Sequence, residues 1–309
     1  MTDTLYDVVI IGGGPAGLTA GLYTSRAKLK SLLIERMIMG GQVMTTTKVE
    51  NYPGFPGGID GPDLMMRFQE HCQEFGLEVV SGDVTDLIDK GEERVVVMDG
   101  QEIHARTVII TTGAEPRKLG LPKEEELTGR GVSYCATCDG AFFRDVPVAI
   151  VGGGDTAAEE ALFLSRFASK VYIIHRRREL RATSILKERL EVNPKIEVLW
   201  NKVVTGFESD QSGLTGAVLK DTESGENSSL PLSGLFVAIG VTPKAAFLAK
   251  LLDLDEDGHI LTDNNCQTSM PGVFAAGDVR KKILKQIATA VGDGAVAAIM
   301  AEKYLMDRE

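Results

Sequence analysis

The sequence predicts an α/β protein of two similar domains, one inserted in the other. A pattern of strand, glycine loop, helix and strand occurs twice, at residues 8–36 and 148–176, without a gap and at a constant offset of 140. Glycine makes up 34 of the 309 residues, about 11% where about 7% is usual. Polar or proline-bearing stretches, 115–131 and 241–246, offer two crossings between domains. We expect a discontinuous domain, 1–115 with 245–309, and an inserted domain, 116–244.

In each copy the glycines follow an apolar strand and open a helix-periodic segment. The first glycine makes the tight turn, the second lets the backbone approach a pyrophosphate, and the third position lets helix and strand pack closely. The helix N-terminus then offers N–H groups to phosphates. The alternative is that these glycines only form turns and bind no ligand. The occurrence of two aligned copies of the motif disfavours this alternative. We therefore expect two Rossmann-like dinucleotide-binding domains (the FAD/NAD(P)-binding fold), with loops formed by Gly12, Gly14, Pro15, Ala16 and Gly17 and by Gly152, Gly154, Asp155, Thr156 and Ala157.

The copies differ at the end of the second strand. The first copy has Glu35, a carboxylate that accepts hydrogen bonds from a ribose 2′-OH and repels a 2′-phosphate. The aligned position is His175, followed by Arg176, Arg177, Arg178 and Arg181. Arginine binds phosphate in bidentate fashion, although a solvated surface run is the alternative. The first loop should hold FAD or NAD, and the second NADP(H).

The remaining elements follow in order along the outer domain. Helical spacing predicts a helix at 16–27 and another at 61–75, which carries Cys72 on its apolar face. Glycine and proline between 39 and 58 predict a long loop. Apolar runs predict strands, and a small-residue segment predicts a last helix. These strands lie at 31–35, 78–80, 94–98, 107–110 and 273–275, and the last helix at 286–302.

In the inserted domain, residues 235–243 read as one buried strand, and 221–234 as a surface hairpin.

Composition narrows the functional classes. Hydrophobic residues make up 43% and charged residues 25%, which is typical of a globular protein and excludes general disorder. The net charge of −11 disfavours non-specific nucleic-acid binding. No apolar run reaches the roughly 18 residues of a membrane span, and the N-terminus lacks a basic signal region. We expect a cytoplasmic protein that needs neither membrane nor nucleic acid.

Two of the four cysteines form Cys135-Ala-Thr-Cys138, followed by Asp139. Half of a zinc site, an accidental pair of core thiols and a redox disulfide are the possible interpretations. A zinc site would need a second ligand pair, and the four histidines are scattered; we expect no metal. We favour a redox disulfide. When it opens, the N–H groups at a helix N-terminus can stabilise the thiolate that forms. Asp139 would move protons as the disulfide opens, or cap a helix. Cys72 is expected in the core.

These motifs together resemble the bacterial low-molecular-weight thioredoxin reductases, of the class II pyridine nucleotide-disulfide oxidoreductases, over essentially the whole chain. The matching segments are 12–17, 40–42, 49–55, 134–140, 152–157, 175–182 and 276–279. The resemblance implies FAD in the outer domain, NADPH in the inserted domain, a homodimer, and thioredoxin as electron acceptor. Two positions depart from the family: Lys285 stands where arginine is usual, and Val241 where histidine is frequent. Lysine keeps the charge but loses the planar fork of arginine.

The resemblance also implies the binding residues. Besides the glycine loops, FAD would contact Glu35, Gly41, Gln42, Asn51, Thr112, Gly113, Asp278, Gln286 and Ile287. NADPH would contact the second loop, His175, Arg176, Arg177, Arg181, Ile239 and Gly240.

We expect electrons to pass from NADPH through FAD to the Cys135–Cys138 disulfide, and the dithiol to reduce a protein disulfide by exchange. By resemblance, Cys138 faces the flavin and attacks the substrate, and Asp139 is acid and base. The disulfide and the NADPH motif share one domain and the flavin belongs to the other. Both must reach the same flavin ring, either at its opposite faces or by a rotation of the domain. The resemblance implies rotation, for which the two crossings are suitable hinges.

Three rival functions remain. A peroxiredoxin-system reductase carries an N-terminal thioredoxin-like extension, for which a first strand at about residue 6 leaves no room. A flavin-dependent ferredoxin–NADP reductase lacks the cysteine pair. A flavoprotein redox sensor would show flavin reduction without sustained turnover.

Overall fold

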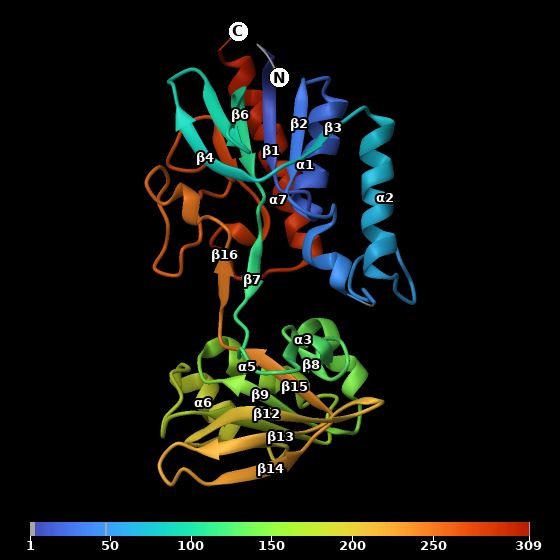
Figure 1. The fold of residues 1–309 in the computed structure, drawn as a ribbon, viewed down its shortest axis with the longest axis vertical. Coiled ribbons are helices and arrows are strands. Elements are labelled where there is room, and N and C mark those ends of the chain that lie inside the picture. The colour runs from blue at the N-terminus through green and yellow to red at the C-terminus, as the bar shows by residue number, and fades with distance from the viewer. Residues whose placement is uncertain (1–3, 47, 309) are drawn as a thin grey trace. The chain divides into compact units, whose positions relative to one another are not determined.

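The structure is a computed structural model, and it describes residues 4–46 and 48–308. The chain divides into two compact units, residues 1–115 with 242–309 and residues 116–241. The second crossing lies between residues 241 and 242, within the expected stretch 241–246 but three residues before the boundary expected after residue 244. Figure 1 labels the helices and strands of both units.

The outer unit is built on a seven-stranded sheet of order β3-β2-β1-β6-β5-β4, with β17 also pairing with β6. The strands β1, β2, β3, β6 and β17 run parallel to one another, whereas β5 pairs antiparallel with both β6 and β4. The strands are β1 Leu5–Ile11, β2 Ser31–Glu35, β3 Glu78–Ser81, β4 Val84–Asp89, β5 Arg94–Met98, β6 Gln101–Ile110 and β17 Val273–Ala275. The central parts of the parallel strands, residues 8–11, 32–34, 108–110 and 273–275, are apolar and buried, as expected for strands covered on both faces.

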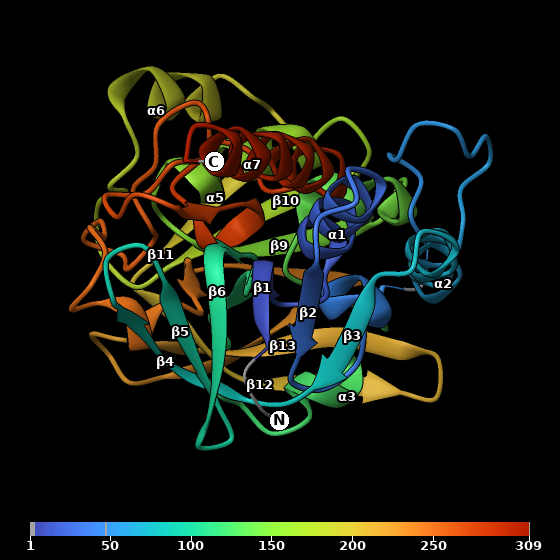
Figure 2. The ribbon, with the colours of Figure 1, turned by 90° about the horizontal axis from the view of Figure 1, so that it is seen from above.

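Alternate residues of these strands form two separate cores. Val8, Ile10 and Leu33 pack with the helices α1 (Pro15–Arg26), α2 (Gly61–Glu74) and α7 (Ile287–Met306). Val9 and Ile11 pack on the opposite face with residues of β4, β5 and the 3₁₀-helix η3 (Ala246–Leu248). Figure 2 shows α1 and α7 side by side on one face of the sheet. Cys72 is 2% exposed in the helix-side core, which confirms the core interpretation of this thiol.

The inserted unit has a five-stranded parallel sheet of order β11-β10-β9-β15-β8 and an antiparallel sheet of order β12-β13-β14. Its strands are β8 Val132–Ser133, β9 Pro147–Gly152, β10 Lys170–His175, β11 Ile196–Trp200, β12 Lys202–Asp210, β13 Gly213–Asp221, β14 Asn227–Pro231 and β15 Gly234–Ala238. Its helices are α3 Glu124–Leu127, α4 Ala136–Asp139, η2 Gly140–Phe143, α5 Asp155–Leu164 and α6 Ser184–Glu191. Two parallel sheets confirm the predicted α/β fold class.

Several predicted boundaries need correction. The predicted strand 235–243 is two strands, β15 and β16 (Val241–Pro243), because Gly240 has a positive φ of 107° and breaks the ladder. The predicted loop 39–58 contains a 3₁₀-helix, η1 (Gly41–Thr45). The predicted hairpin is formed by β13 and β14, so its first strand begins earlier than residue 221. At the crossings, β7 (Ala114–Pro116) pairs with β16.

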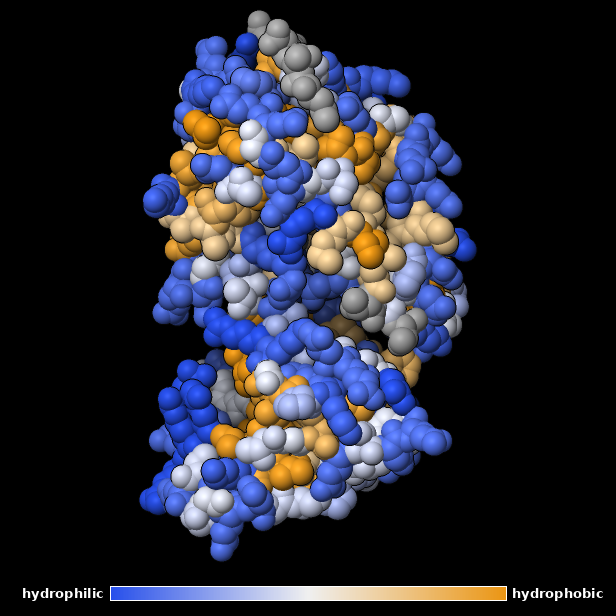
Figure 3. Space-filling model, in the orientation of Figure 1, coloured by the Kyte–Doolittle hydropathy of each residue, from blue (hydrophilic) through white to orange (hydrophobic). Residues whose placement is uncertain are grey.

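Within the described ranges, no helix is both long and apolar enough to cross a membrane. Figure 3 shows hydrophilic residues dominating the visible face of each unit, in accord with the net charge of −11.

Candidate functional site

The first glycine loop joins β1 to α1, and each glycine has a distinct steric role. Gly12 has φ +108°, and a Cβ there would lie 2.5 Å from the carbonyl oxygen of Thr111. A Cβ on Gly17 would lie 1.9 Å from the carbonyl oxygen of Gly12, so only glycine allows the helix to pack so closely. A Cβ on Gly14 would meet no described atom within 4 Å. The loop is thus open at Gly14, where no side chain caps α1, and Pro15 and Ala16 begin its first turn.

Glu35 lies beside this loop at the carboxyl end of β2. Its Oε2 accepts a hydrogen bond from the backbone N–H of Gly13 at 2.6 Å, and its Oε1 accepts one from Met37 at 3.0 Å. The two amides fix the carboxylate next to the open side of the loop, as an acceptor for hydroxyl groups.

Other predicted flavin residues meet at the same strand ends. A Cβ on Gly41 would lie 3.4 Å from Cα of Gly14, and a Cβ on Gly277 would lie 3.0 Å from Cβ of Ala16. Gly277 and Asp278 belong to the 3₁₀-helix η4 (Gly277–Val279), directly after β17. The carboxyl ends of parallel strands are the usual location of ligands in such sheets.

Thr112, Gly113 and Gln42 form a second part of this region. Thr112 Oγ1 donates to the carbonyl of Lys244 at 2.6 Å, and Gly113 accepts from the amide of Lys244 at 2.9 Å. The amide of Gln42 donates to the carbonyl of Ala114. These contacts hold the segment after β6 against the returning chain.

Asn51 and Gln286 form the third part. Asn51 Nδ2 donates to Gln286 Oε1 at 3.0 Å, and Gln286 is the N-cap residue of α7 in a capping box with Thr289. Ile287 is the first residue of that helix. The structure therefore brings Asn51, 235 positions away in sequence, to the start of α7.

Asp278 is the unusual member of the group. Its Oδ1 is buried and has no hydrogen-bond partner among the described residues. Burial raises the pKa of its carboxyl group above the usual value. A buried oxygen without a partner is costly unless a ligand completes it, so this atom points to a bound hydroxyl or amide group.

The second glycine loop repeats the geometry in the inserted unit. A Cβ on Gly152 would lie 2.6 Å from both Cβ of Ala157 and the carbonyl oxygen of Ala238, whereas a Cβ on Gly154 would meet nothing within 4 Å. No side chain caps α5, which begins with Asp155 and Thr156. This loop too presents an open side and free helix N–H groups.

His175 occupies the position of Glu35 but faces differently. It is 6% exposed, and its Nδ1 and Nε2 lie 2.8 and 2.9 Å from the carbonyl oxygens of Gly152 and Glu179. A Cβ on Gly153 would lie 2.2 Å from the imidazole ring. The imidazole of His175 therefore packs against the glycine loop and bonds to its backbone.

The basic cluster consists of Arg176, Arg177, Arg178 and Arg181, all exposed. Arg178 differs from the others because its Nε and Nη2 both lie 2.7 Å from Oε1 of Glu223. The amide of Arg181 donates to the carbonyl of Gly153 at 2.6 Å, which ties this arginine to the glycine loop. Directly after β15, Ile239 is 37% exposed, and the carbonyl of Gly240 accepts a hydrogen bond from the amide of Arg117 at 2.9 Å.

The cysteine pair is a disulfide between Cys135 and Cys138, with Cα atoms 5.3 Å apart. Cys135 is the N-cap residue of α4, and the amide of Cys138 donates to its Sγ at 3.2 Å. An N–H donor favours the anionic form of a thiol. Among the described residues, no three His, Cys, Asp or Glu side chains are grouped so that they could hold a metal ion.

Asp139 ends α4 and contacts Ser133. Ser133 Oγ donates to Asp139 Oδ2 at 2.7 Å and accepts from the amide of Cys135 at 3.1 Å. Asp139 stands at the N-cap position of η2, but its carboxylate makes no capping hydrogen bond there. Burial raises the pKa of Asp139, which makes it a proton donor at higher pH than an exposed aspartate.

Sequence reasoning missed Ser133, which no spacing pattern marks, and Glu160 in α5. The Glu160 carboxylate accepts a hydrogen bond from the amide of Ala136, inside the cysteine motif. Burial, with a smaller contribution from the Glu159 charge, raises the pKa of Glu160 from 4.5 to about 7. A burial-dependent group of this kind has no signal in sequence.

Glu160 predicts a pH dependence of stability. The folded protein keeps this proton up to about pH 7, and the unfolded chain loses it near pH 4.5. The free energy of unfolding should therefore fall as pH rises from 4.5 to above 7, by about 3 kcal/mol relative to Glu160→Gln. Urea unfolding of both proteins across this range measures the effect. Glu188→Gln, at an exposed glutamate of α6, is the matched control, and parallel curves for wild type and Glu160→Gln would contradict the prediction.

Lys285, which replaces the family arginine, has a buried partner. Its Nζ lies 3.0 Å from Nε2 of His259, whose Nδ1 lies 3.4 Å from Oδ1 of Asp255. Burial lowers the pKa values of both Lys285 and His259. The lysine thus contacts the imidazole of His259 through its ammonium group, which lacks the planar fork of arginine.

Known proteins of one family match this chain over most of its length. The sequence profile described as pyridine nucleotide-disulphide oxidoreductase matches residues 6–294. The thioredoxin reductase of Bacillus subtilis is 49% identical over 303 residues, which cover 98% of this chain and 96% of that protein.

Two solved structures extend the comparison. The thioredoxin reductase of Streptococcus pyogenes is 43% identical and superposes with a TM-score of 0.94, over 99% of this chain and all of the other. The thioredoxin reductase of Lactococcus lactis, described as the FR conformation, is 45% identical and superposes with a TM-score of 0.68. The match covers 98% of this chain and 99% of the other.

Proposed function

The chain belongs to the pyridine nucleotide-disulphide oxidoreductases and, within them, to the thioredoxin reductase family; from this premise we propose that it reduces the disulfide of a thioredoxin with electrons from NADPH. The observation that carries the proposal is the Cys135–Cys138 disulfide, placed with Asp139 in the same unit as the second glycine loop. Opening this disulfide takes up two electrons and two protons, and the dithiol passes both to the substrate disulfide.

The outer unit fits FAD. The open side of the loop at Gly14 would take the pyrophosphate, Glu35 the ribose hydroxyls, and Asp278 a hydroxyl of the ribityl chain through its unpartnered Oδ1. Gly41, Gln42, Asn51, Thr112, Gly113, Gln286 and Ile287 would complete the site. Bound FAD would supply the two-electron chemistry that connects a nicotinamide donor with a disulfide.

The inserted unit fits NADPH. Gly154 leaves room for a pyrophosphate as Gly14 does, and Arg176, Arg177 and Arg181 would bind the 2′-phosphate. His175 would support this site by holding the loop. Ile239 and Gly240 would contact the nicotinamide half.

Asp139 would handle the protons of disulfide opening. Ser133 orients the carboxylate, and burial favours its protonated form. A protonated Asp139 can give a proton to the leaving thiolate and recover it afterwards.

The flavin residues and the disulfide lie in different units, and we propose that the inserted unit rotates about the crossings during turnover. The two solved relatives support this, because they are about equally similar in sequence but superpose on this chain to very different extents. The proposal further includes a homodimer in the cytoplasm.

The test is steady-state NADPH oxidation by the FAD-loaded protein, with and without thioredoxin. We expect consumption that depends on thioredoxin. Consumption without thioredoxin would overturn the proposal in favour of an oxidase, and flavin reduction without turnover would indicate a redox sensor. Turnover only with a peroxiredoxin or another thioredoxin-like protein would change the partner.

A further inference from the structure

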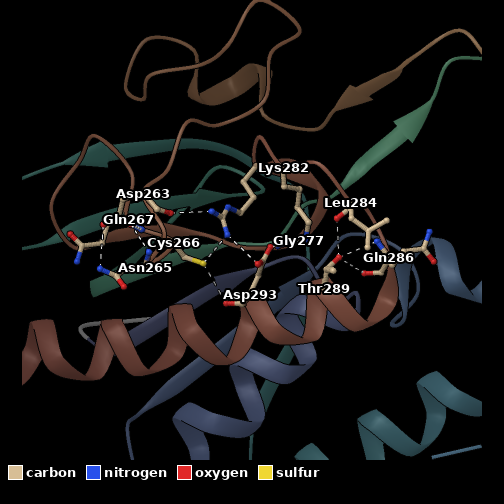
Figure 4. A network of polar contacts seen from close by, with 11 residues as sticks. Asp263, Asn265, Cys266, Gln267, Gly277, Lys282, Leu284, Gln286, Thr289 and Asp293 are labelled. Atoms are coloured by element: carbon tan, nitrogen blue, oxygen red, sulfur yellow. Dashed lines mark hydrogen bonds and ion pairs between the residues drawn. The ribbon is translucent and has the colours of Figure 1, made fainter. Parts of the chain in front are cut away.

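A carboxylate on α7 gathers the segment that carries Asp278. Asp293 Oδ2 accepts from the amide of Gly277 at 3.1 Å and from Nζ of Lys282 at 2.8 Å, while its Oδ1 accepts from Nη1 of Arg280 at 3.1 Å. Figure 4 shows these contacts converging on Asp293 from the segment above the helix. We name Asp293, Arg280 and Lys282 the α7 clamp.

The clamp is shielded from solvent. The side chains of Asp293, Arg280 and Lys282 are 17%, 12% and 11% exposed. Ion pairs at such depth are little screened by salt, and removing one partner leaves the others with uncompensated charge. The clamp is therefore a strong constraint, unlike the ion pairs of exposed side chains.

Backbone hydrogen bonds hold the two ends of the constrained segment, from the amide of Ala276 to the carbonyl of Ile110 at 2.9 Å and from the amide of Ile260 to the carbonyl of Val279 at 3.0 Å. Its middle, at Gly277 and Asp278, is where the clamp acts. The element η4 is only three residues long and has no side-chain cap, and Gly277 has a positive φ of 79°. Asp293 binds the amide of Gly277, the residue directly before Asp278. It thereby fixes the backbone from which the unpartnered carboxylate oxygen projects.

We propose that Asp293 is a positioning residue for the flavin: through the amide of Gly277 and through Arg280 and Lys282, it holds Asp278 where its free oxygen meets the bound cofactor. This inference rests on the proposed use of FAD. Asp293 does not itself need to touch the flavin, because it acts through the segment that it anchors.

Cys266 is a built-in reporter of the clamp. Its Sγ lies 3.3 Å from Nη1 of Arg280 and 3.7 Å from the carbonyl oxygen of Asp293, and the residue is 1% exposed. Burial raises the pKa of this thiol to about 11. An intact clamp should thus keep Cys266 unreactive, and an open clamp should expose it. In the oxidised protein the remaining free thiol, Cys72, lies in the helix-side core, away from the clamp.

The experiment compares FAD binding by apoprotein of wild type and Asp293→Asn. We expect the dissociation constant for FAD to rise about tenfold to a hundredfold, the loss expected for a charge-assisted contact, with NADP⁺ affinity unchanged because its site lies in the inserted unit. Alkylation of Cys266 in the apoprotein, followed by peptide mass spectrometry, should be faster in the variant, and Cys72 should stay unmodified.

A matched pair of lysine variants tests the clamp independently of Asp293→Asn. Lys282→Met deletes one arm of the clamp and keeps the Gly277 contact, so it should weaken FAD binding less than Asp293→Asn. Lys281→Met is its control, because the Lys281 side chain is 64% exposed and its Nζ lies 3.9 Å from Asp255. If Asp293→Asn does not fold, this pair decides.

The outcomes separate two failures. Wild-type protein that does not bind FAD overturns the cofactor proposal and this inference with it. Wild-type protein that binds FAD, with Asp293→Asn or Lys282→Met binding it equally well, overturns the inference alone. Equal loss of FAD and NADP⁺ affinity also overturns it, because a general loss of structure would then explain the result.

Discussion

Cys138→Ser is expected to lower thioredoxin-dependent NADPH oxidation by at least about a thousandfold, because a serine hydroxyl neither forms a disulfide nor attacks one at neutral pH. Anaerobic titration should then separate the two redox groups. Wild-type protein should consume about two equivalents of NADPH per chain, one for the flavin and one for the disulfide, and the variant about one. Flavin absorbance and NADPH consumption measure both quantities.

Cys72→Ala is the control for this experiment. Burial raises the pKa of the Cys72 thiol to about 12, and its Sγ lies 3.1 Å from the carbonyl oxygen of Leu18 in the core, so it should take no part in exchange. Thioredoxin turnover that survives Cys138→Ser would refute the disulfide relay and leave Cys135–Cys138 as a structural pair.

Arg176→Ala combined with Arg177→Ala should raise the KM for NADPH about tenfold to a hundredfold while the KM for NADH changes by less than about twofold. The reason is that the two donors differ only in the 2′-phosphate, and each guanidinium lost removes a charge-assisted contact to it. Initial rates with each donor at fixed thioredoxin concentration give the comparison.

Arg178→Ala is the matched control, since its guanidinium is already paired with Glu223. It should leave the KM for both donors nearly unchanged. Equal increases of KM for NADPH and NADH in the double variant would show that the arginines support the fold and do not read the phosphate.

Much of the site could be predicted because it depends on local geometry. The glycines at 12, 14 and 17 and at 152 and 154 are required where a strand turns into a helix, and the structure shows the clash or the opening that each one serves. The two cysteines are three residues apart, so their closeness is also local, and the structure joins them as the disulfide that the sequence analysis favoured. The strand ending in Glu35 is equally local, because its apolar run is buried in a parallel sheet.

Other features depended on residues distant in sequence. His175 aligns with Glu35, yet its ring is used beneath the glycine loop, because carbonyl groups of Gly152 and Glu179 lie within hydrogen-bond distance. Residues 235–243 carry one apolar run, yet the chain breaks at Gly240. Neither outcome is encoded in periodicity.

The amino-acid sequence by itself determined the two glycine loops and the closeness of Cys135 and Cys138, since these follow from the local geometry of a strand–loop–helix turn and of a short spacing. The repeat at a constant offset predicted one domain inserted in the other. Only the tertiary structure decided which charged groups act together. Asp293 meets Gly277, Ser133 meets Asp139, and Glu160 meets the amide of Ala136. Burial and hydrogen bonding shift the protonation and position of such groups, and both quantities arise when separate elements pack against one another.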